Sequence, residues 1–202
     1  MASIPPSTDP VFLAKKQSVI DVIKARRCRE AHYINSNFNN YSDLIGMLFE
    51  FSKTFDCDAS YLDSLLAPFS DADLIANGIY YNKIGGVITN PNFVIKCTGI
   101  SIVIDQGGAY RELDVTYDST VSSISVSNNT LVGILNIGGR AKVDLLAVGA
   151  GSCINILLVK SCGTYISELT KITENSCVNH TGVDEDAVFG GYECVINATE
   201  PS

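Results

Sequence analysis

Two histidines, His32 and His180, are the only imidazoles that this 202-residue chain offers for acid–base or nucleophilic catalysis. A serine or cysteine nucleophile needs a neighbouring base, because that base takes the proton of the attacking group. His32 lies in a polar segment beside Cys28 and Glu30, and His180 follows Cys177 by three residues. The chain contains no Gly-x-Ser-x-Gly turn that would present a nucleophile. We therefore assign no catalytic residue and predict that the protein is not an enzyme.

Cysteine and histidine could also bind zinc. Cys162, Cys177, His180 and Cys194 supply four candidate ligands, but their spacing lacks the Cys-x2-Cys pairs of structural zinc sites. Free cysteines usually behave as small apolar side chains. We therefore expect packing roles for the cysteines, Cys153 and Cys162 among them, and we predict no metal site.

Carboxylates are the remaining candidates for chemistry. The densest acidic run, Asp184–Asp186, lacks the spaced ligands of a calcium loop, so we expect a solvated turn there. Asp144 is the one acidic residue of the repeat described below, with Arg140 and Lys142 nearby, whereas glycoside hydrolysis needs a pair of carboxylates. The stretch Gly149-Ala150-Gly151 recurs at a turn position, which explains it without a phosphate-binding loop. We thus predict no cofactor-binding residue either.

An eleven-residue repeat from Val121 to Gly163 organises the second half of the chain. Its apolar columns lie at relative positions 0, +3 and +5, and each copy ends in small or polar residues. The twelve column residues are Val121, Val132, Val143 and Ile154, then Ile124, Leu135, Leu146 and Leu157, and finally Val126, Ile137, Val148 and Val159. A fixed period of this kind indicates strand-plus-turn units that bury their apolar faces by stacking.

Two architectures satisfy this repeat. Two copies make about 22 residues, close to one coil of a parallel β-solenoid. An antiparallel sandwich or jelly roll, with one copy per strand and turn, is the alternative. Both place the +3 and +5 columns inward, and both need a bend between positions 0 and +3, because a regular strand alternates its faces strictly.

The repeat weakens after Gly163. Tyr165, Glu168 and Thr170 occupy the three columns of the next copy, and a one-residue slip recovers only Ile166 and Leu169. Terminal repeats are usually atypical because they cap the stack. We expect residues 165–202 to form this cap, with a last strand near 192–196.

The first part of the chain has helical signals instead. Asp9 and Pro10 form a good helix start, which predicts a helix to about Cys28. Apolar spacing predicts further helices over 42–55 and 61–66, and Ser70 with Asp73 predicts a fourth that ends at Asn77-Gly78. After Gly78 we expect strands at 87–88, 93–95, 100–104 and 113–117. The predicted class is therefore α+β, with an arm at 1–9, a helical docking module at 10–80 and a β-rich repeat module at 81–202.

Composition restricts the partners. The net charge is −8, made up of +2 over residues 1–53 and −10 over residues 54–202, which argues against nucleic acid as a ligand. No apolar run reaches the length of a membrane span, and the first residues do not resemble a secretory signal. An odd count of seven cysteines then suggests free thiols in a reducing cytosol.

The arm, the helices to Asn77 and the repeat from Val121 together resemble, in organisation, virion proteins of tailed bacteriophages. The resemblance implies a non-enzymatic structural or assembly protein of a virus particle, such as a fibre, a decoration protein or a head–tail connecting component. It implies synthesis in the host cytoplasm, assembly with copies of itself (a trimer, for example) and docking to other virion proteins through the helices. The alternatives are a glycan- or protein-binding adhesin module and a small β-helix carbohydrate-active enzyme.

Overall fold

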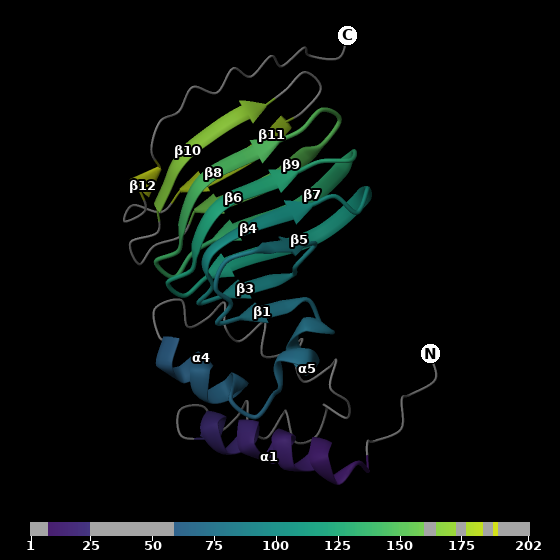
Figure 1. Cartoon of the computed structure of the whole chain (residues 1–202), viewed down its shortest axis with the longest axis vertical. Coiled ribbons are helices and arrows are strands. Elements are labelled where there is room, and N and C mark those ends of the chain that lie inside the picture. The colour runs from purple at the N-terminus through teal and green to yellow at the C-terminus, as the bar shows by residue number, and fades with distance from the viewer. Residues whose placement is uncertain (1–7, 25–58, 160–164, 173–176, 184–187, 190–202) are drawn as a thin grey trace. The chain divides into compact units, whose positions relative to one another are not determined.

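The computed structural model describes residues 8–24, 59–159, 165–172, 177–183 and 188–189 (Figure 1). The chain separates into two units, one ending at Asn77 and the other starting at Gly78. In the described parts, the first unit contains helices and the second contains strands.

The first unit contains the described helices α1 (Pro10–Lys24), α4 (Ala59–Leu66) and α5 (Asp71–Ile75). Helix α1 begins where the sequence predicts, because the Asp9 carboxylate accepts a hydrogen bond of 3.1 Å from the Val11 amide. Apolar residues of all three helices are buried, namely Phe12, Val19, Ile20, Leu65, Leu66 and Leu74. The predicted helix over 42–55, the end of the first helix beyond Lys24 and most of the arm lie outside the described residues.

The second unit is built from parallel strands in two sheets, ordered β1-β3-β5-β7-β9-β11 and β12-β10-β8-β6-β4-β2. The strands are β1 (Ile79–Tyr81), β2 (Val87–Thr89), β3 (Phe93–Ile95), β4 (Thr98–Ile104), β5 (Gly108–Thr116), β6 (Thr120–Val126), β7 (Thr130–Ile137), β8 (Lys142–Val148), β9 (Cys153–Val159), β10 (Tyr165–Ile172), β11 (Cys177–Val183) and β12 (Val188–Phe189). Successive strands alternate between the sheets, so each coil adds one strand to both. This winding is a parallel β-solenoid (Figure 1).

Strand register confirms the period read from the sequence. Val121 pairs with Val143, and Leu135 pairs with Leu157, so two copies of the repeat make one coil. The antiparallel alternative is wrong, because every pairing between described strands is parallel. A chain that alternates sheets returns to each sheet in the same direction, which leaves no antiparallel neighbours.

The interior of the solenoid holds the three predicted columns. All twelve column residues are at most 1% exposed. The ladder between β7 and β9 passes from the pair Val132–Ile154 to the pair Ile134–Ile156 without pairing the residues between them. This interruption is the bend that the 0-to-+3 spacing requires, since it lets positions 0 and +3 both face the core.

The repeat extends further in both directions than its aliphatic columns indicate. Tyr110, Leu113 and Val115 of β5 pair with the three column residues of β7, so they form an earlier copy. At the other end, Ile166 pairs with Val143 and Leu169 with Leu146, which is the register of the one-residue slip. The last strand predicted near 192–196 lies outside the described residues.

Candidate functional site

The residues that could supply chemistry do not gather at one place in the described structure. His32, Cys162, Cys194 and the acidic run 184–186 lie outside the described residues. Among the parts that the structure describes, no group of three or more histidine, cysteine, aspartate or glutamate residues could hold a metal ion. His180 and Cys177 both lie on β11. The backbone of His180 pairs with Ile156 of β9, and the backbone of Cys177 pairs with Cys153 of β9.

The prediction for Cys153 is wrong, because this residue is disulfide-bonded and is not a free thiol with a packing role. Cys153 precedes the column residue Ile154 and so lies outside the three apolar columns, whereas the packing prediction rests on the usual behaviour of free cysteines. Cys97 is a buried free thiol, as predicted, and its Sγ lies 3.4 Å from the carbonyl oxygens of Tyr80 and Ile95. Burial raises the pKa of the Cys97 thiol, which keeps it protonated and unreactive.

Asp144 stands exposed on β8, without a second carboxylate at its own level on the neighbouring strand β6. The equivalent position there, 22 residues earlier, holds Ser122. On the other neighbour, Glu168 pairs with Leu145 and so lies one register position beyond Asp144. Retaining and inverting hydrolysis both require two carboxylates at a fixed separation across the bond to be cleaved. The described register provides no such matched pair at Asp144.

Arg140, expected near Asp144, instead binds Asp118 in the turn of the preceding coil. Arg140 Nε and Nη2 donate hydrogen bonds of 2.7 and 2.8 Å to the two carboxylate oxygens of Asp118. The pKa of Asp118 is lowered, first by these hydrogen bonds and then by the charges of Arg140 and Lys96, while partial burial opposes the shift. All three residues have positive φ, so they occupy equivalent strained turn positions in successive coils. Asp118 cannot be identified as a partner of Arg140 from the sequence, because only the coil register places the two residues together.

A buried polar cluster lies on the first sheet, between apolar columns +3 and +5. Asp114 on β5 is 1% exposed, and its Oδ1 accepts a hydrogen bond from Nδ2 of Asn136 on β7, which is 7% exposed. Tyr110 is buried nearby, and its hydroxyl donates to the carbonyl oxygen of Pro91. Burial, followed by the charge of Asp114 and the proximity of Tyr80, raises the pKa of Tyr110 well above its usual range.

Asp114 and Tyr110 are residue types that can act as a general acid or base, but a substrate cannot reach them because both side chains are buried. A catalytic carboxylate must approach the proton that it transfers to within hydrogen-bond distance. Asp114 is almost fully covered, and Tyr110 remains a protonated donor to a backbone carbonyl. Both side chains therefore connect neighbouring parts of the solenoid rather than presenting a reactive group.

Polar side chains in the turns connect one coil to the next. Asn90 Nδ2 donates to Asp105 Oδ1 at 3.0 Å, and Asn128 Nδ2 donates to the Asp105 carbonyl at 2.7 Å. In the same row of turns, Ser152 Oγ accepts a hydrogen bond from the Thr130 amide at 3.1 Å. The stretch 149–151 forms one of these turns, as predicted, and no phosphate-binding loop is needed to explain its glycines.

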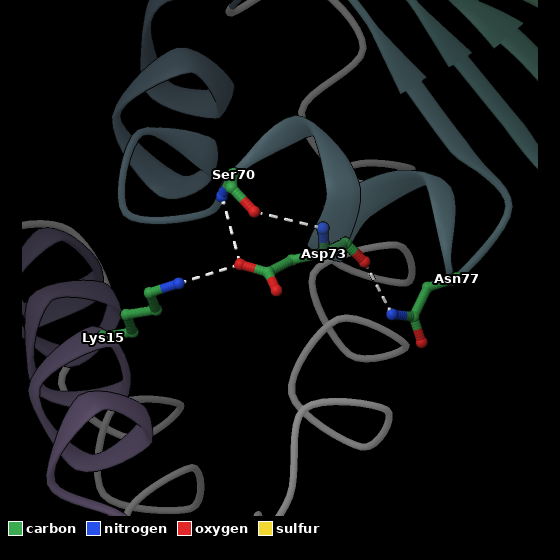
Figure 2. Close-up of polar contacts among 4 residues, drawn as sticks. All are labelled: Lys15, Ser70, Asp73 and Asn77. Atoms are coloured by element: carbon green, nitrogen blue, oxygen red, sulfur yellow. Dashed lines mark hydrogen bonds and ion pairs between the residues drawn. The ribbon is translucent and has the colours of Figure 1, made fainter.

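The helical unit has its own polar cluster, centred on Asp73 (Figure 2). Ser70 and Asp73 form a reciprocal capping box at the start of α5, with both hydrogen bonds at 3.2 Å. Lys15 of α1 donates to Asp73 Oδ2 at 2.8 Å and lies 5.9 Å from the centre of the Phe69 ring. Hydrogen bonds from Lys15 and then from Ser70 lower the pKa of Asp73. The cluster ties α1 to α5.

No family model, no curated protein and no solved structure matches this chain. None of the helices in the described residues is long and apolar enough to cross a membrane. The polar side chains described above make contacts between successive coils and between helices.

Proposed function

We propose that this protein is a non-catalytic structural protein that assembles with copies of itself through its β-solenoid. The proposal rests on the observation that carboxylate side chains in the described part are hydrogen-bonded within the protein. Asp118, Asp114 and Asp73 are all engaged with neighbouring coils or helices. An enzyme would instead need such groups directed at a substrate rather than hydrogen-bonded to one another.

We place the contact between copies at the outer edge of β2. Among the described strands, β2 is the last of its sheet, and an unpaired strand edge readily pairs with another chain. Two aliphatic side chains beside this edge are unusually exposed, Ile84 at 87% and Val87 at 68%. Burying them against a second copy would remove apolar surface from water and pair the edge in the same step.

We further propose that the helical unit docks to a different protein. Val11 and Leu13 on α1 are 56% and 45% exposed, although Phe12 between them is buried. A partner that covered the first turn of α1 would bury this apolar surface. Following the resemblance of organisation, we propose that this partner is another component of a virus particle and that the chain is part of that particle.

The mass of the full chain in solution tests self-assembly. We expect sedimentation equilibrium to give a dimer, a trimer or a larger closed ring that persists at micromolar concentration. A monomer at all concentrations would contradict the proposal, and a monomer that binds glycans on an array would favour the adhesin alternative. The virion proposal is tested separately: purified particles from the source should contain the chain at a fixed stoichiometry.

A further inference from the structure

Cys153 at the start of β9 is disulfide-bonded, and the fold indicates which cysteine is its partner. We propose that the bond joins Cys153 to Cys177, so that a covalent link connects two consecutive coils near the end of the solenoid. Neither the repeat pattern nor the proposed assembly requires this link.

The backbone register is the first argument. Strand β11 pairs with β9 so that Cys177 faces Cys153 directly. Neighbouring strands lie about 4.8 Å apart. Disulfides join residues whose Cα atoms are about 4.4–6.8 Å apart, so directly paired cysteines need no backbone movement.

A side-chain contact on the same two strands is the second, independent argument. Asn179 Nδ2 donates a hydrogen bond of 3.2 Å to Asn155 Oδ1, which shows that equivalent side chains of these coils stack on one another. Each asparagine follows its cysteine by two residues, and residues two apart on a strand lie on the same face. The paired cysteines therefore belong to one row of stacked positions.

The other described cysteine does not compete for this bond. Cys97 is a free thiol, buried in the core of the solenoid and hydrogen-bonded to backbone carbonyls. Cys153 is half-buried, so a small disulfide reagent can reach it.

The bond forms by thiol–disulfide exchange with a small-molecule disulfide such as oxidised glutathione. The thiolate of one cysteine attacks the reagent, forms a mixed disulfide and releases one reduced thiol. The second cysteine then attacks the mixed disulfide and releases the other thiol. The two cysteines lose two electrons and two protons in total, and the reagent gains them.

This link changes the expectation for the surroundings of the mature protein. A lasting disulfide requires an oxidising compartment or release from the reducing cytosol, in contrast to the free thiols predicted from the cysteine count. Among the described strands, β11 is the last of the first sheet, where neighbours pack on one side only. A cross-link there holds the terminal coil against unravelling.

Peptide mapping of the full chain tests the proposal. The purified protein is treated with oxidised glutathione, denatured, alkylated without reduction and digested. We expect a linked peptide that contains Cys153 and Cys177 and is lighter by two hydrogen atoms than the two reduced peptides together. A link from Cys153 to any other cysteine, or an alkylated Cys153, would overturn the assignment.

Two variants provide the controls. Cys177→Ser should leave Cys153 open to alkylation, whereas Cys97→Ser should leave the linked peptide intact. A reductant should lower the melting temperature of the wild type by about 5–10 °C but leave that of Cys177→Ser unchanged. An equal response of both proteins to the reductant would also contradict the proposal.

Discussion

Asp118 and Arg140 occupy the same turn position in consecutive coils, 22 residues apart, and join through two hydrogen bonds of 2.7 and 2.8 Å. Lys96 precedes Asp118 by the same interval, so charges alternate in sign along this row of turns. Arginine and a carboxylate commonly form such a bidentate pair, but here about half of each side chain is exposed to solvent. The pair therefore helps to fix the coil register more than it adds to stability.

Replacing Arg140 by alanine should lower the free energy of unfolding by only about 0.2–1 kcal/mol, because solvent screens an exposed ion pair. Urea denaturation at neutral pH measures this loss. A double-mutant cycle with Asp118→Asn isolates the pair, and a coupling energy well above that range would show that the pair is more protected than its exposure indicates.

The same pair predicts a pH dependence. The pKa of Asp118 is lowered in the folded protein, so its contribution is present above the ordinary carboxyl pKa of about 4 and is lost as the pH falls through the folded pKa. The stability difference between wild type and Arg140→Ala should therefore be largest at neutral pH and disappear in acid. A difference that stayed constant down to pH ~2 would contradict this account.

Truncation in the apolar columns should have a much larger effect. Leu146 is 0% exposed, and Leu146→Ala should cost about 2–5 kcal/mol because it leaves a cavity in a close-packed interior. The adjacent Leu145 is half-buried and is the same residue type, so Leu145→Ala is the matched control and should cost clearly less. Chemical denaturation of both variants measures the difference, and equal losses would argue against the inward column.

The apolar columns could be predicted from the sequence because residue type and period both encode burial. Leu135, Leu146 and Leu157 recur at constant spacing, and all three are fully buried on strands. Tyr110 belongs to the same column system, but as an aromatic residue it does not match columns made of valine, isoleucine and leucine. The period predicts the length of one coil, whereas the choice between a solenoid and an antiparallel sandwich depends on the pairing between strands.

The polar contacts could not be predicted in the same way. Asp118 and Arg140 differ in type, and nothing in the local sequence indicates that they face each other until the coil length is known. Asp114 and Asn136 are polar residues at a position expected to face outward, yet both are buried. The odd cysteine count indicates free thiols, but the pairing of Cys153 depends on the register between strands, which the count does not contain.

Gly133 lies under a steric constraint that the local sequence does not reveal. A Cβ atom added at this residue would lie 2.6 Å from the carbonyl oxygen of Arg111 on the neighbouring strand, closer than real contacts allow. Gly133→Ala should therefore destabilise the protein by about 1–3 kcal/mol, although alanine is otherwise preferred to glycine in a strand.

Gly149 provides the matched control, because a Cβ atom there would lie 3.2 Å from the Val126 carbonyl oxygen, a milder contact. Urea denaturation should show a smaller loss for Gly149→Ala. If Gly133→Ala left the free energy of unfolding unchanged, strands β5 and β7 would have room for a Cβ atom at this position.

Asp73 in the helical unit combines a helix cap with an ion pair, and two substitutions separate these roles. Asp73→Asn keeps an oxygen that can accept from the Ser70 amide but removes the charge facing Lys15. Asp73→Ala removes both and should cost about 1–2 kcal/mol. Thermal melts of the full chain followed by circular dichroism should rank wild type above Asp73→Asn and Asp73→Ala lowest. Equal losses would mean that the ion pair with Lys15, rather than the capping hydrogen bond, accounts for the contribution of Asp73 to stability.

The proposed contact at the outer edge of β2 gives a direct test of assembly. Lysine is a residue that proteins use to prevent pairing at strand edges, because its charge resists burial against another chain. Replacing both Ile84 and Val87 by lysine should therefore convert the proposed oligomer into monomers without altering the circular dichroism spectrum. Leu131→Lys is the matched control, because Leu131 is also an exposed aliphatic residue, at 48%, but lies on β7 in the middle of its sheet. Sedimentation equilibrium separates the outcomes: an oligomer that survives the edge substitutions but dissociates with Leu131→Lys would move the contact from the edge to the face of the solenoid.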